Sequence, residues 1–358
     1  MSVIRQSSED CRTFILENVE KHPSEIAKVV AKKFKISRQA ANKHLQKLVK
    51  EKTLSTAGNT RSRVYSLTSH ATLVKTYLLA ANLAEHEIWQ RDIKPALGLM
   101  PDNVLNIWDY CFTEMFNNVI DHSLAEKVTV ELTKSAVATQ IIILDDGVGI
   151  FKKIQTKLGL FDERHAVLEL AKGKFTTDPA NHSGEGIFFS SRACDSYHIF
   201  SGGVDFSHQY GRKEDWIFER TRATKGTAVI MKVKNHTARK LKRIFDEFAG
   251  DDYGFNKTVV PVRLTQYGDD ALVSRSQAKR LLNRVDRFKT VMLDFKGVET
   301  IGQAFADEIF RVFVNQHPDI DLIEMNVNKD VGNMISRAKA AARSMLEKDD
   351  NGKQENLF

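Results

Sequence analysis

The chain has 358 residues, 42% of them hydrophobic, and carries a formal net charge of +7. This length accommodates about two to three domains. No apolar run reaches the roughly 18 residues that a membrane span requires, and the N-terminus lacks the apolar core of a signal peptide. Three scattered cysteines, with no cysteine and histidine cluster at zinc spacing, favour a reducing compartment over a disulfide framework. We therefore expect a cytoplasmic, multidomain α+β protein that does not enter a membrane.

The basic charge lies almost entirely at the N-terminus. Residues 1–70 contain 14 Lys and Arg against 6 Asp and Glu, a net charge of +8. Because the whole chain carries +7, the other 288 residues sum to −1. Such a localised excess predicts a polyanionic partner for this segment in particular.

Hydrophobic spacing predicts three helices in this segment, over residues 8–20, 23–34 and 37–49. Pro23 with Ser24 is typical of a helix start, and Ser37 is typical of an N-cap. A turn at Gly58 and Asn59 then separates residues 53–55 from residues 61–67, which indicates a β-hairpin. In this order the elements of residues 1–70 resemble a winged helix-turn-helix domain.

The third helix would be the recognition helix of such a domain. Its outer side is expected to carry six polar side chains: Ser37, Arg38, Gln39, Asn42, Lys43 and Lys47. Arg, Asn and Gln read base edges, whereas Lys and Ser contact phosphate well. On the wing, Arg61 and Arg63 would reach phosphate or a minor groove. The resemblance implies binding of double-stranded DNA, with a homodimer expected because one winged domain usually binds a half-site. The alternative is a protein-interaction domain with a solvated basic face.

Residues 71–95 are predicted to form a linker helix. Its apolar positions are Leu73, Tyr77, Leu78, Ala81, Leu83 and Ile88. Pro95 and Pro101 mark the end of the predicted helix. This face is apolar enough to pack on a neighbouring domain or a second subunit.

Four motifs follow in chain order. A helix is predicted over residues 112–122, and on it Glu114, Asn118 and His122 share one face because they are four residues apart. Burying such a polar stripe costs free energy unless something polar sits there. The other three motifs are a buried-strand run ending in Asp145-x-Gly147-x-Gly149, the segment Ser183-Gly184-Glu185-Gly186-Ile187, and Lys225-Gly226-Thr227.

Taken together, these motifs resemble the nucleotide-binding boxes of the GHKL ATPases, which include gyrase and the histidine and anti-sigma kinases. The resemblance covers residues 96–235 and implies an α/β sandwich with helices on one face of a mixed sheet. It implies ATP and Mg²⁺ as cofactors. Each motif alone is weak, since a polar stripe is usually solvated and a Gly-x-Gly is usually a turn.

The resemblance also implies a role for each matching residue. Glu114 would act as general base, and Asn118 would be the ligand of Mg²⁺. Asp145 and Thr227 would form the adenine hydrogen-bond set, and Gly147 and Gly149 would let the backbone approach the base. Gly184 and Gly186 would open a helix, predicted over residues 187–195, that seats phosphate.

Two further positions carry alternatives. His122 matches the Asn-x-x-x-His form of the anti-sigma kinases, although a packed or exposed helix histidine fits equally well. Residues 151–183 would be the ATP lid, and in it Lys174 would contact the γ-phosphate, against the commoner solvated lysine.

The rest of the chain alternates between strands and helices. Residues 236–257 are predicted to be a linker with a basic amphipathic helix over 236–248. Residues 258–348 contain predicted strands at 258–264, 290–295 and 321–327 and helices at 274–285, 302–314 and 330–346. This order predicts a mostly parallel sheet with helical cover and resembles a STAS-like domain, the fold of anti-anti-sigma factors. The only hydroxyl at the junction where such factors are phosphorylated is Thr300, so docking without phosphorylation is the alternative. Residues 349–358 are predicted to be a disordered tail.

These elements lead to three hypotheses. The first is an ATP-binding and ATP-hydrolysing DNA-binding regulator, in which the nucleotide state controls the winged helix and the STAS-like domain. The second is a Ser/Thr protein kinase of the anti-sigma type, with Glu114 as base, acting on a STAS-like protein partner or on its own Thr300. The third is a scaffold in which the nucleotide only stabilises the fold.

Overall fold

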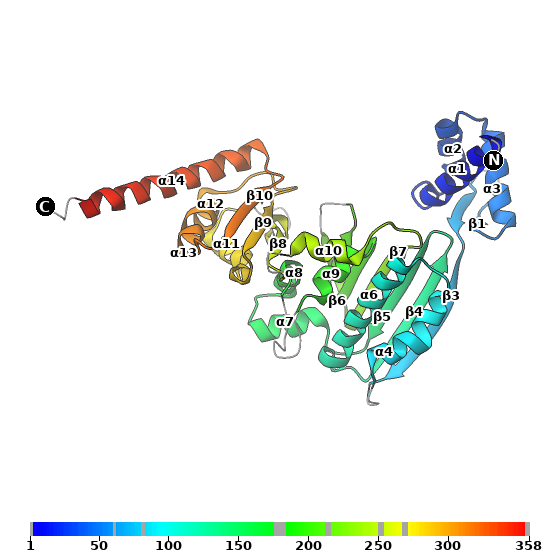
Figure 1. The fold of residues 1–358 in the computed structure, drawn as a ribbon, viewed down its shortest axis with the longest axis horizontal. Helices are drawn as coiled ribbons and strands as arrows, with labels where there is room; N and C mark the ends of the chain where they lie inside the picture. Colours follow the sequence, from blue (N-terminus) through cyan, green and yellow to red (C-terminus); the bar gives the residue numbers. More distant parts are fainter. Residues whose placement is uncertain are drawn as a thin grey trace.

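The computed structural model describes residues 3–59, 62–79, 83–174, 184–211, 216–249, 254–266 and 271–354. The chain is elongated, with an N-terminal three-helix unit, a large central sheet and a smaller C-terminal sheet in succession (Figure 1). The two termini lie at opposite ends of the long axis (Figure 1). Within the described residues, no helix is both long and apolar enough to cross a bilayer.

The N-terminal unit has its own core. It comprises α1 (Val3–Asn18), α2 (Ile26–Phe34) and α3 (Arg38–Lys50), followed by the antiparallel strands β1 (Leu54–Ala57) and β2 (Val64–Leu67). The apolar stripes of the helices meet around residues such as Ile15, Ile26 and Leu45, which form a cluster separate from the rest of the chain. Ser37 caps α3 by accepting a hydrogen bond from the Ala40 main-chain N–H at 3.1 Å, as predicted.

The central sheet has the strand order β3-β4-β5-β7-β6. The strands are β3 (Ser69–Leu78), β4 (Lys127–Ser135), β5 (Ala138–Asp145), β6 (Ser196–Gln209) and β7 (Trp216–Lys234). Every neighbouring pair is antiparallel, so the predicted mixed arrangement is wrong for this sheet. The motifs fixed a helix-and-strand order but carried no information on strand direction.

One face of this sheet is covered by helices. The helices α6 (Asp102–His122) and α9 (Gly186–Ala193) pack on it (Figure 1). Alternate strand residues, among them Val130 and Ile141, are buried against Phe112 and Phe116 of α6. The opposite face keeps residues such as Leu144 exposed. This one-sided cover is the arrangement that the sequence predicts.

The predicted linker helix is wrong over its first half. Residues 69–78 form β3, which pairs with β4 along its whole length, and the chain becomes helical only at α4 (Glu85–Ile88), the π-helical η1 (Trp89–Ile93) and α5 (Lys94–Leu97). Tyr77 is buried while its neighbour Leu78 is 66% exposed, the alternation of an edge strand. Ala81 of the predicted apolar face lies outside the described residues.

The C-terminal unit is built on a parallel sheet, as predicted, and its strand order is β10-β9-β8. Its strands are β8 (Lys257–Pro261), β9 (Thr290–Asp294) and β10 (Asp321–Met325). The surrounding elements are the 3-10 segments η2 (Val262–Thr265) and η3 (Val285–Arg287), α11 (Arg275–Leu282), α12 (Gln303–Asp307), the π-helical η4 (Glu308–Phe313), α13 (Val314–Gln316) and α14 (Lys329–Gln354). The helix α14 runs on to Gln354, so the predicted disorder is wrong for residues 349–354, where no proline interrupts the helix.

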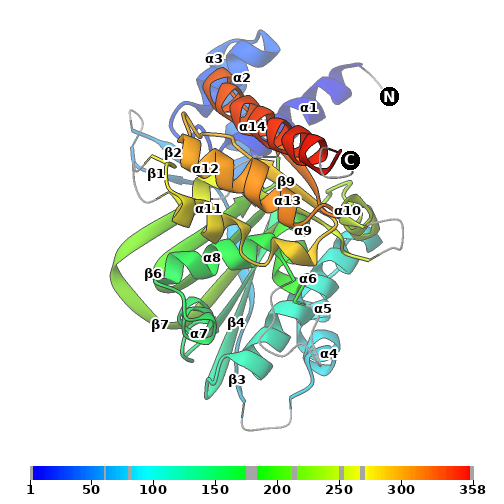
Figure 2. The same cartoon turned by 90° about the vertical axis from the view of Figure 1, so that its left-hand side faces the viewer.

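The central and C-terminal units share one hydrophobic core. Between them lie α8 (Glu163–Lys172) and α10 (Leu241–Phe248), and α7 (Ile150–Leu158) packs on α8 and β6. The helix α8 contacts β6 on one side and β8 on the other, and both views place it between the large sheet and the C-terminal unit (Figures 1 and 2). Eight consecutive residues, 165–172, are buried along it. A segment of the predicted lid is therefore an interior element of the molecule.

Candidate functional site

The polar stripe on α6 lies at the margin of the core. Glu114, Asn118 and His122 are all half-buried, whereas Phe112 and Phe116 on the other side of the helix are fully buried against the sheet. The amide nitrogen of Asn118 lies 4.0 Å from the Met115 sulfur, a weak contact. The stripe therefore has partial access to solvent and lies on one face, as the spacing predicts.

Asp145 lies at the end of β5 with its side chain buried. Its Oδ1 accepts hydrogen bonds from the main-chain N–H groups of Gly147, at 2.9 Å, and Thr227, at 3.3 Å. Burial raises the pKa of this carboxyl group, while the two backbone hydrogen bonds oppose that shift. The main chain thus fixes a carboxyl group at the base of the predicted site.

Two glycines near Asp145, Gly147 and Gly226, allow neighbouring segments of backbone to approach each other closely. A Cβ on Gly147 would lie 2.1 Å from the Ser123 main-chain oxygen. One on Gly226, where φ is +75°, would lie 2.0 Å from the Asp145 main-chain oxygen. Any side chain at either position would collide with backbone, so these approaches require glycine.

Two hydrogen bonds complete this junction. The Val148 main-chain N–H donates to the Ser123 carbonyl at 3.0 Å, and that of Ile150 donates to Thr227 Oγ1 at 3.0 Å. The structure therefore brings Asp145, Gly147, Gly149 and Thr227 together from β5, the following loop and β7.

Glu114 lies against the start of α9. A Cβ on Gly186 would lie 2.0 Å from Glu114 Oε2, so the glycine leaves the space that the carboxylate occupies. Gly184 precedes it with φ of +74°, a left-handed conformation that favours glycine. The first and third predicted motifs therefore meet at this point, through Glu114 and Gly186.

The sequence analysis missed two residues beside Glu114. Burial and the charges of Glu114 and Glu185 raise the pKa of Tyr110. Burial likewise raises the pKa of Glu185, which Lys174 opposes. The signal for Tyr110 was present in the sequence, because it precedes Glu114 by four residues on the same helical face.

A third missed residue is Lys153 on α7. Its Nζ donates to the main-chain oxygen of His122 at 2.5 Å, at the C-terminal end of α6. Burial lowers the pKa of this lysine. A cation at the C-terminal end of α6 interacts favourably with the negative end of the helix dipole. The hydrogen bond also fixes the backbone of His122, the last residue of the polar stripe.

Lys174 is held by the C-terminal unit. Its Nζ donates to the Arg287 main-chain oxygen at 3.0 Å and lies 4.9 Å from the centre of the Phe288 ring. The predicted contact between this side chain and a nucleotide phosphate is thus not the contact it makes here. The next lid residues, 175–183, lie outside the described residues.

The structure places the predicted DNA-contacting residues of α3 together on one surface. Ser37, at the helix start, and Arg38, Gln39, Asn42, Lys43 and Lys47 on α3 are all exposed. The opposite side of the helix is buried through Ala41, Leu45 and Leu48. Arg63 is half-buried next to β2, and Arg61 lies outside the described residues.

Thr300 is exposed in the turn between β9 and α12. Asn328 fixes this turn, because its Nδ2 donates to the main-chain oxygens of Val298 and Glu299, both at 2.9 Å. The hydroxyl-bearing residue is therefore accessible on an ordered turn, as a docking or modification site requires.

Comparison with known families identifies one part of the chain. Residues 277–331 match the family described as "STAS-like domain of unknown function (DUF4325)". These residues run from within α11 to the start of α14, so the prediction of a STAS-like domain is confirmed here. No curated protein matches the chain.

Proposed function

We propose that residues 96–235 form a GHKL-type ATP-binding domain, and that the chain is a DNA-binding regulator controlled by ATP. The observation that carries this proposal is the meeting of four separate motifs at one edge of the central sheet. Asp145, Gly147 and Thr227 are joined by hydrogen bonds, and Glu114 lies against Gly186. Motifs that were only successive in the sequence are adjacent in space.

The residues present fit ATP and Mg²⁺. Asp145 is a buried acceptor of the kind that fixes an adenine amino group, and its backbone bonds hold it in place. Asn118 offers a neutral oxygen to Mg²⁺, which keeps water ligands and binds through substrate phosphates. Bound Mg²⁺ would neutralise developing charge on the phosphates. Glu114, on the same face as Asn118, would accept the proton of the attacking water as general base.

DNA binding is proposed for residues 1–70, as a winged helix-turn-helix domain. Its support is the exposed polar face of α3 and the net charge of +8 confined to this segment. Cations on an exposed helix favour phosphate contacts, and the Arg, Asn and Gln side chains beside them suit base edges. We expect two copies of the chain on a two-fold-symmetric site.

Control by ATP would pass through α8. The predicted lid, residues 151–183, joins the Asp145 loop to the loop that opens α9. Its helix α8 packs directly on β8 of the C-terminal unit. A ligand shifts a conformational equilibrium only when it binds one conformer better than another. ATP contacts that move the lid would therefore change the packing of the STAS-like domain.

Hydrolysis of γ-labelled ATP by the full chain tests this proposal. We expect Glu114→Gln to reduce phosphate release by about 10²–10⁴-fold, the usual contribution of a general base, while ATP still binds. Asp109→Asn is the matched control, because Asp109 is an exposed carboxylate on the same helix. Equal rates in wild type and Glu114→Gln would overturn the catalytic assignment.

A second candidate function is protein phosphorylation of the anti-sigma type. The exposed Thr300 in a STAS-like domain favours it, together with His122 four residues after Asn118. In this reaction Glu114 would take the proton of the threonine hydroxyl. Label that stays on the protein in wild type, and is lost in Thr300→Ala, would establish it. Free phosphate without labelled protein excludes Thr300 as the acceptor.

A further inference from the structure

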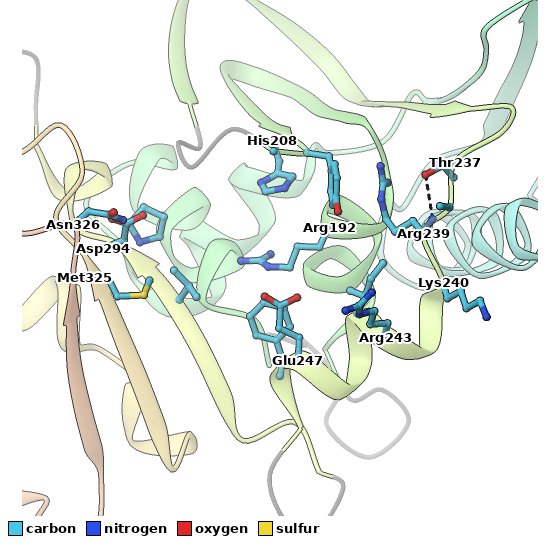
Figure 3. Close-up of a pocket in the computed structure, with 17 residues that line it drawn as sticks. Arg192, His208, Thr237, Arg239, Lys240, Arg243, Glu247, Asp294, Met325 and Asn326 are labelled. Atoms are coloured by element: carbon cyan, nitrogen blue, oxygen red, sulfur yellow. Dashed lines mark hydrogen bonds between the residues drawn. The ribbon is translucent and has the colours of Figure 1, made fainter.

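A second cavity lies away from the predicted nucleotide site, between the central and C-terminal units. Its volume is about 900 Å³. The helices α9 and α10 and the end of β6 form one wall, and the C-terminal unit forms the other (Figure 3). None of the residues proposed to bind ATP lines it. Its size falls within the usual range for small-molecule sites, about 300–1,000 Å³.

The cavity is basic. Its lining includes four Lys and Arg residues and two carboxylates, an excess of two positive charges. The cations are Arg192 on α9, Arg239 and Lys240 before α10, and Arg243 on α10. Three of them lie in the basic segment predicted over residues 236–248, and the fold adds Arg192 from a distant part of the sequence. A cavity of this charge attracts anions.

Arg239 is fixed before any ligand arrives. Its side chain is only 6% exposed, and Nη2 lies 2.7 Å from Asp195 Oδ1. Nη1 donates to the Ala193 main-chain oxygen, and the guanidinium stacks 3.7 Å from the centre of the Tyr210 ring. Its Nε is buried without an acceptor among the described residues. The wall therefore holds a cation whose position is fixed by its contacts with Asp195, Ala193 and Tyr210.

Arg192 is held in a similar way. Its guanidinium carbon lies 3.4 Å from the centre of the Phe188 ring, and Nη1 donates to the Phe188 main-chain oxygen at 3.1 Å. Figure 3 shows the side chain extending into the cavity between His208 and Glu247. Planar guanidinium groups fixed in this manner bind phosphate oxygens with defined geometry.

The opposite wall is formed by the carboxyl ends of the parallel strands. Pro261, Asp294 and Met325, the last residues of β8, β9 and β10, all line the cavity. Ligands of open α/β sheets bind outside these ends. Asp294 Oδ1 accepts a hydrogen bond from Asn326 Nδ2 at 2.7 Å, which creates a polar wall suited to hydroxyl or base groups.

We propose that this cavity binds a phosphorylated small molecule of mononucleotide size. The phosphate would lie among Arg192, Arg239 and Arg243, and the neutral polar part would lie on the Asp294 and Asn326 wall. Glu247 on the cationic wall and Asp294 on the opposite wall disfavour a long polyanion, which would meet both carboxylates. Since the two walls belong to different units, the ligand would act as an effector at their interface. This inference does not depend on the ATP proposal.

Calorimetric titration of the full chain tests it with four probes: inorganic phosphate, ribose 5-phosphate, AMP and GMP. The critical variant is Arg243→Glu, since Arg243 is exposed and its replacement leaves the core intact. Lys242→Glu is the matched control, an exposed cation on the same helix that does not line the cavity. We expect Arg243→Glu to weaken binding by at least about tenfold, the effect of one lost charge-assisted bond, and Lys242→Glu to bind as wild type.

Comparing the probes distinguishes a nucleotide ligand from a sugar phosphate. Stronger binding of AMP or GMP than of ribose 5-phosphate assigns a nucleotide, and equal binding assigns a sugar phosphate. Binding that survives in Asn118→Ala and is lost in Arg243→Glu belongs to this cavity. The reverse pattern overturns the proposal, as does a failure of all four probes to bind wild type. A single-stranded oligonucleotide is titrated as a fifth probe, and tight binding of it alone, lost in Arg243→Glu, overturns the assignment to a small molecule.

Discussion

The helices α6 and α8 both carry charged residues into the core region, but they use them differently. On α6 the polar residues form one half-buried stripe, and the opposite side of the helix packs on the sheet. On α8 no side is left to solvent along residues 165–172, and Glu169 and Lys172 are 3% and 1% exposed. The stripe on α6 leaves charge accessible to a ligand. The pair on α8 uses charge to join two units of the molecule.

The bonds of α8 show how that junction is made. Lys172 Nζ lies 2.8 Å from Glu169 Oε1 and donates to the main-chain oxygen of Asn283 at 2.6 Å. The Asn283 side chain donates to the same Glu169 oxygen at 3.2 Å. Burial lowers the pKa of Lys172, which the charge of Glu169 opposes. A buried ion pair of this kind matters most when one partner is removed.

The largest predicted effect therefore comes from breaking this pair. Lys172→Met leaves Glu169 buried without its nearest cation, and the remaining one, Arg284, lies farther away, with Nε 3.9 Å from Glu169 Oε2. We therefore expect a loss of about 3 kcal/mol in the free energy of unfolding. Denaturant titration measures it. Lys157→Met, at an exposed lysine on α7, is the control and should change stability by less than about 0.5 kcal/mol.

A double variant sharpens this prediction. Glu169→Leu together with Lys172→Met removes both charges, so we expect it to be more stable than Lys172→Met alone. If Lys172→Met unfolds like wild type, the pair does not hold the two units together.

The next effect concerns the accessible stripe on α6. Gly186→Ala places a methyl group where Glu114 lies, so we expect ATP hydrolysis to fall by at least about tenfold, or 1.4 kcal/mol. Gly332→Ala is the control, because a Cβ there would be 3.4 Å from its nearest neighbour, an ordinary contact. Phosphate release measures both. Full activity in Gly186→Ala would show that α9 does not approach a working Glu114.

A smaller effect tests β3, the strand that replaced a predicted helix. Burial alone raises the pKa of Asp92, but hydrogen bonds from Arg91, Lys75 and Tyr77 lower it to about 2. This pKa is below the pKa of an aspartate in the unfolded chain, about 3.9. The ionised Asp92 therefore stabilises the fold above about pH 4, and this contribution is lost as the pH falls toward 2.

The pH dependence of stability measures this contribution. We expect Asp92→Asn to be less stable than wild type at neutral pH, and to lose less stability between pH 5 and pH 2. Profiles of the two proteins that run parallel over this range would contradict the role of Asp92 in fixing β3.

The smallest effect concerns α3. Lys43→Ala should weaken DNA binding to all sequences alike and reduce the slope of log affinity against log salt by about one. Lys152→Ala, at an exposed lysine on α7, should leave the slope unchanged. Fluorescence anisotropy at several salt concentrations measures both. The same slope in wild type and Lys43→Ala would place DNA, if bound, elsewhere.

The features predicted correctly from the sequence are local. The shared face of Glu114 and Asn118 follows from helical spacing alone. The helix N-cap at Ser37 has the same local character. The meeting of the four motifs came from the family resemblance, and not from the spacing itself.

The features that were missed depend on distant partners. Leu73 and Tyr77 fit a helical face as well as an edge strand, and only pairing with β4 decides between them. The contact of Lys174 with Arg287 joins positions more than a hundred residues apart. The basic cavity likewise combines Arg192 and Arg243 from different elements with the ends of three strands. The spacing of hydrophobic residues along the sequence does not predict such contacts between distant positions.

The most direct test of the central claim is the binding of ATP with Mg²⁺ to the full chain by calorimetry, with Asn118→Ala and Asn106→Ala beside wild type. Asn106 is an exposed asparagine on α6 and is the matched control. We predict that wild type and Asn106→Ala bind one ATP per chain and that Asn118→Ala does not. Binding of equal strength in all three proteins, or in none of them, would contradict an ATP site on the polar stripe of α6.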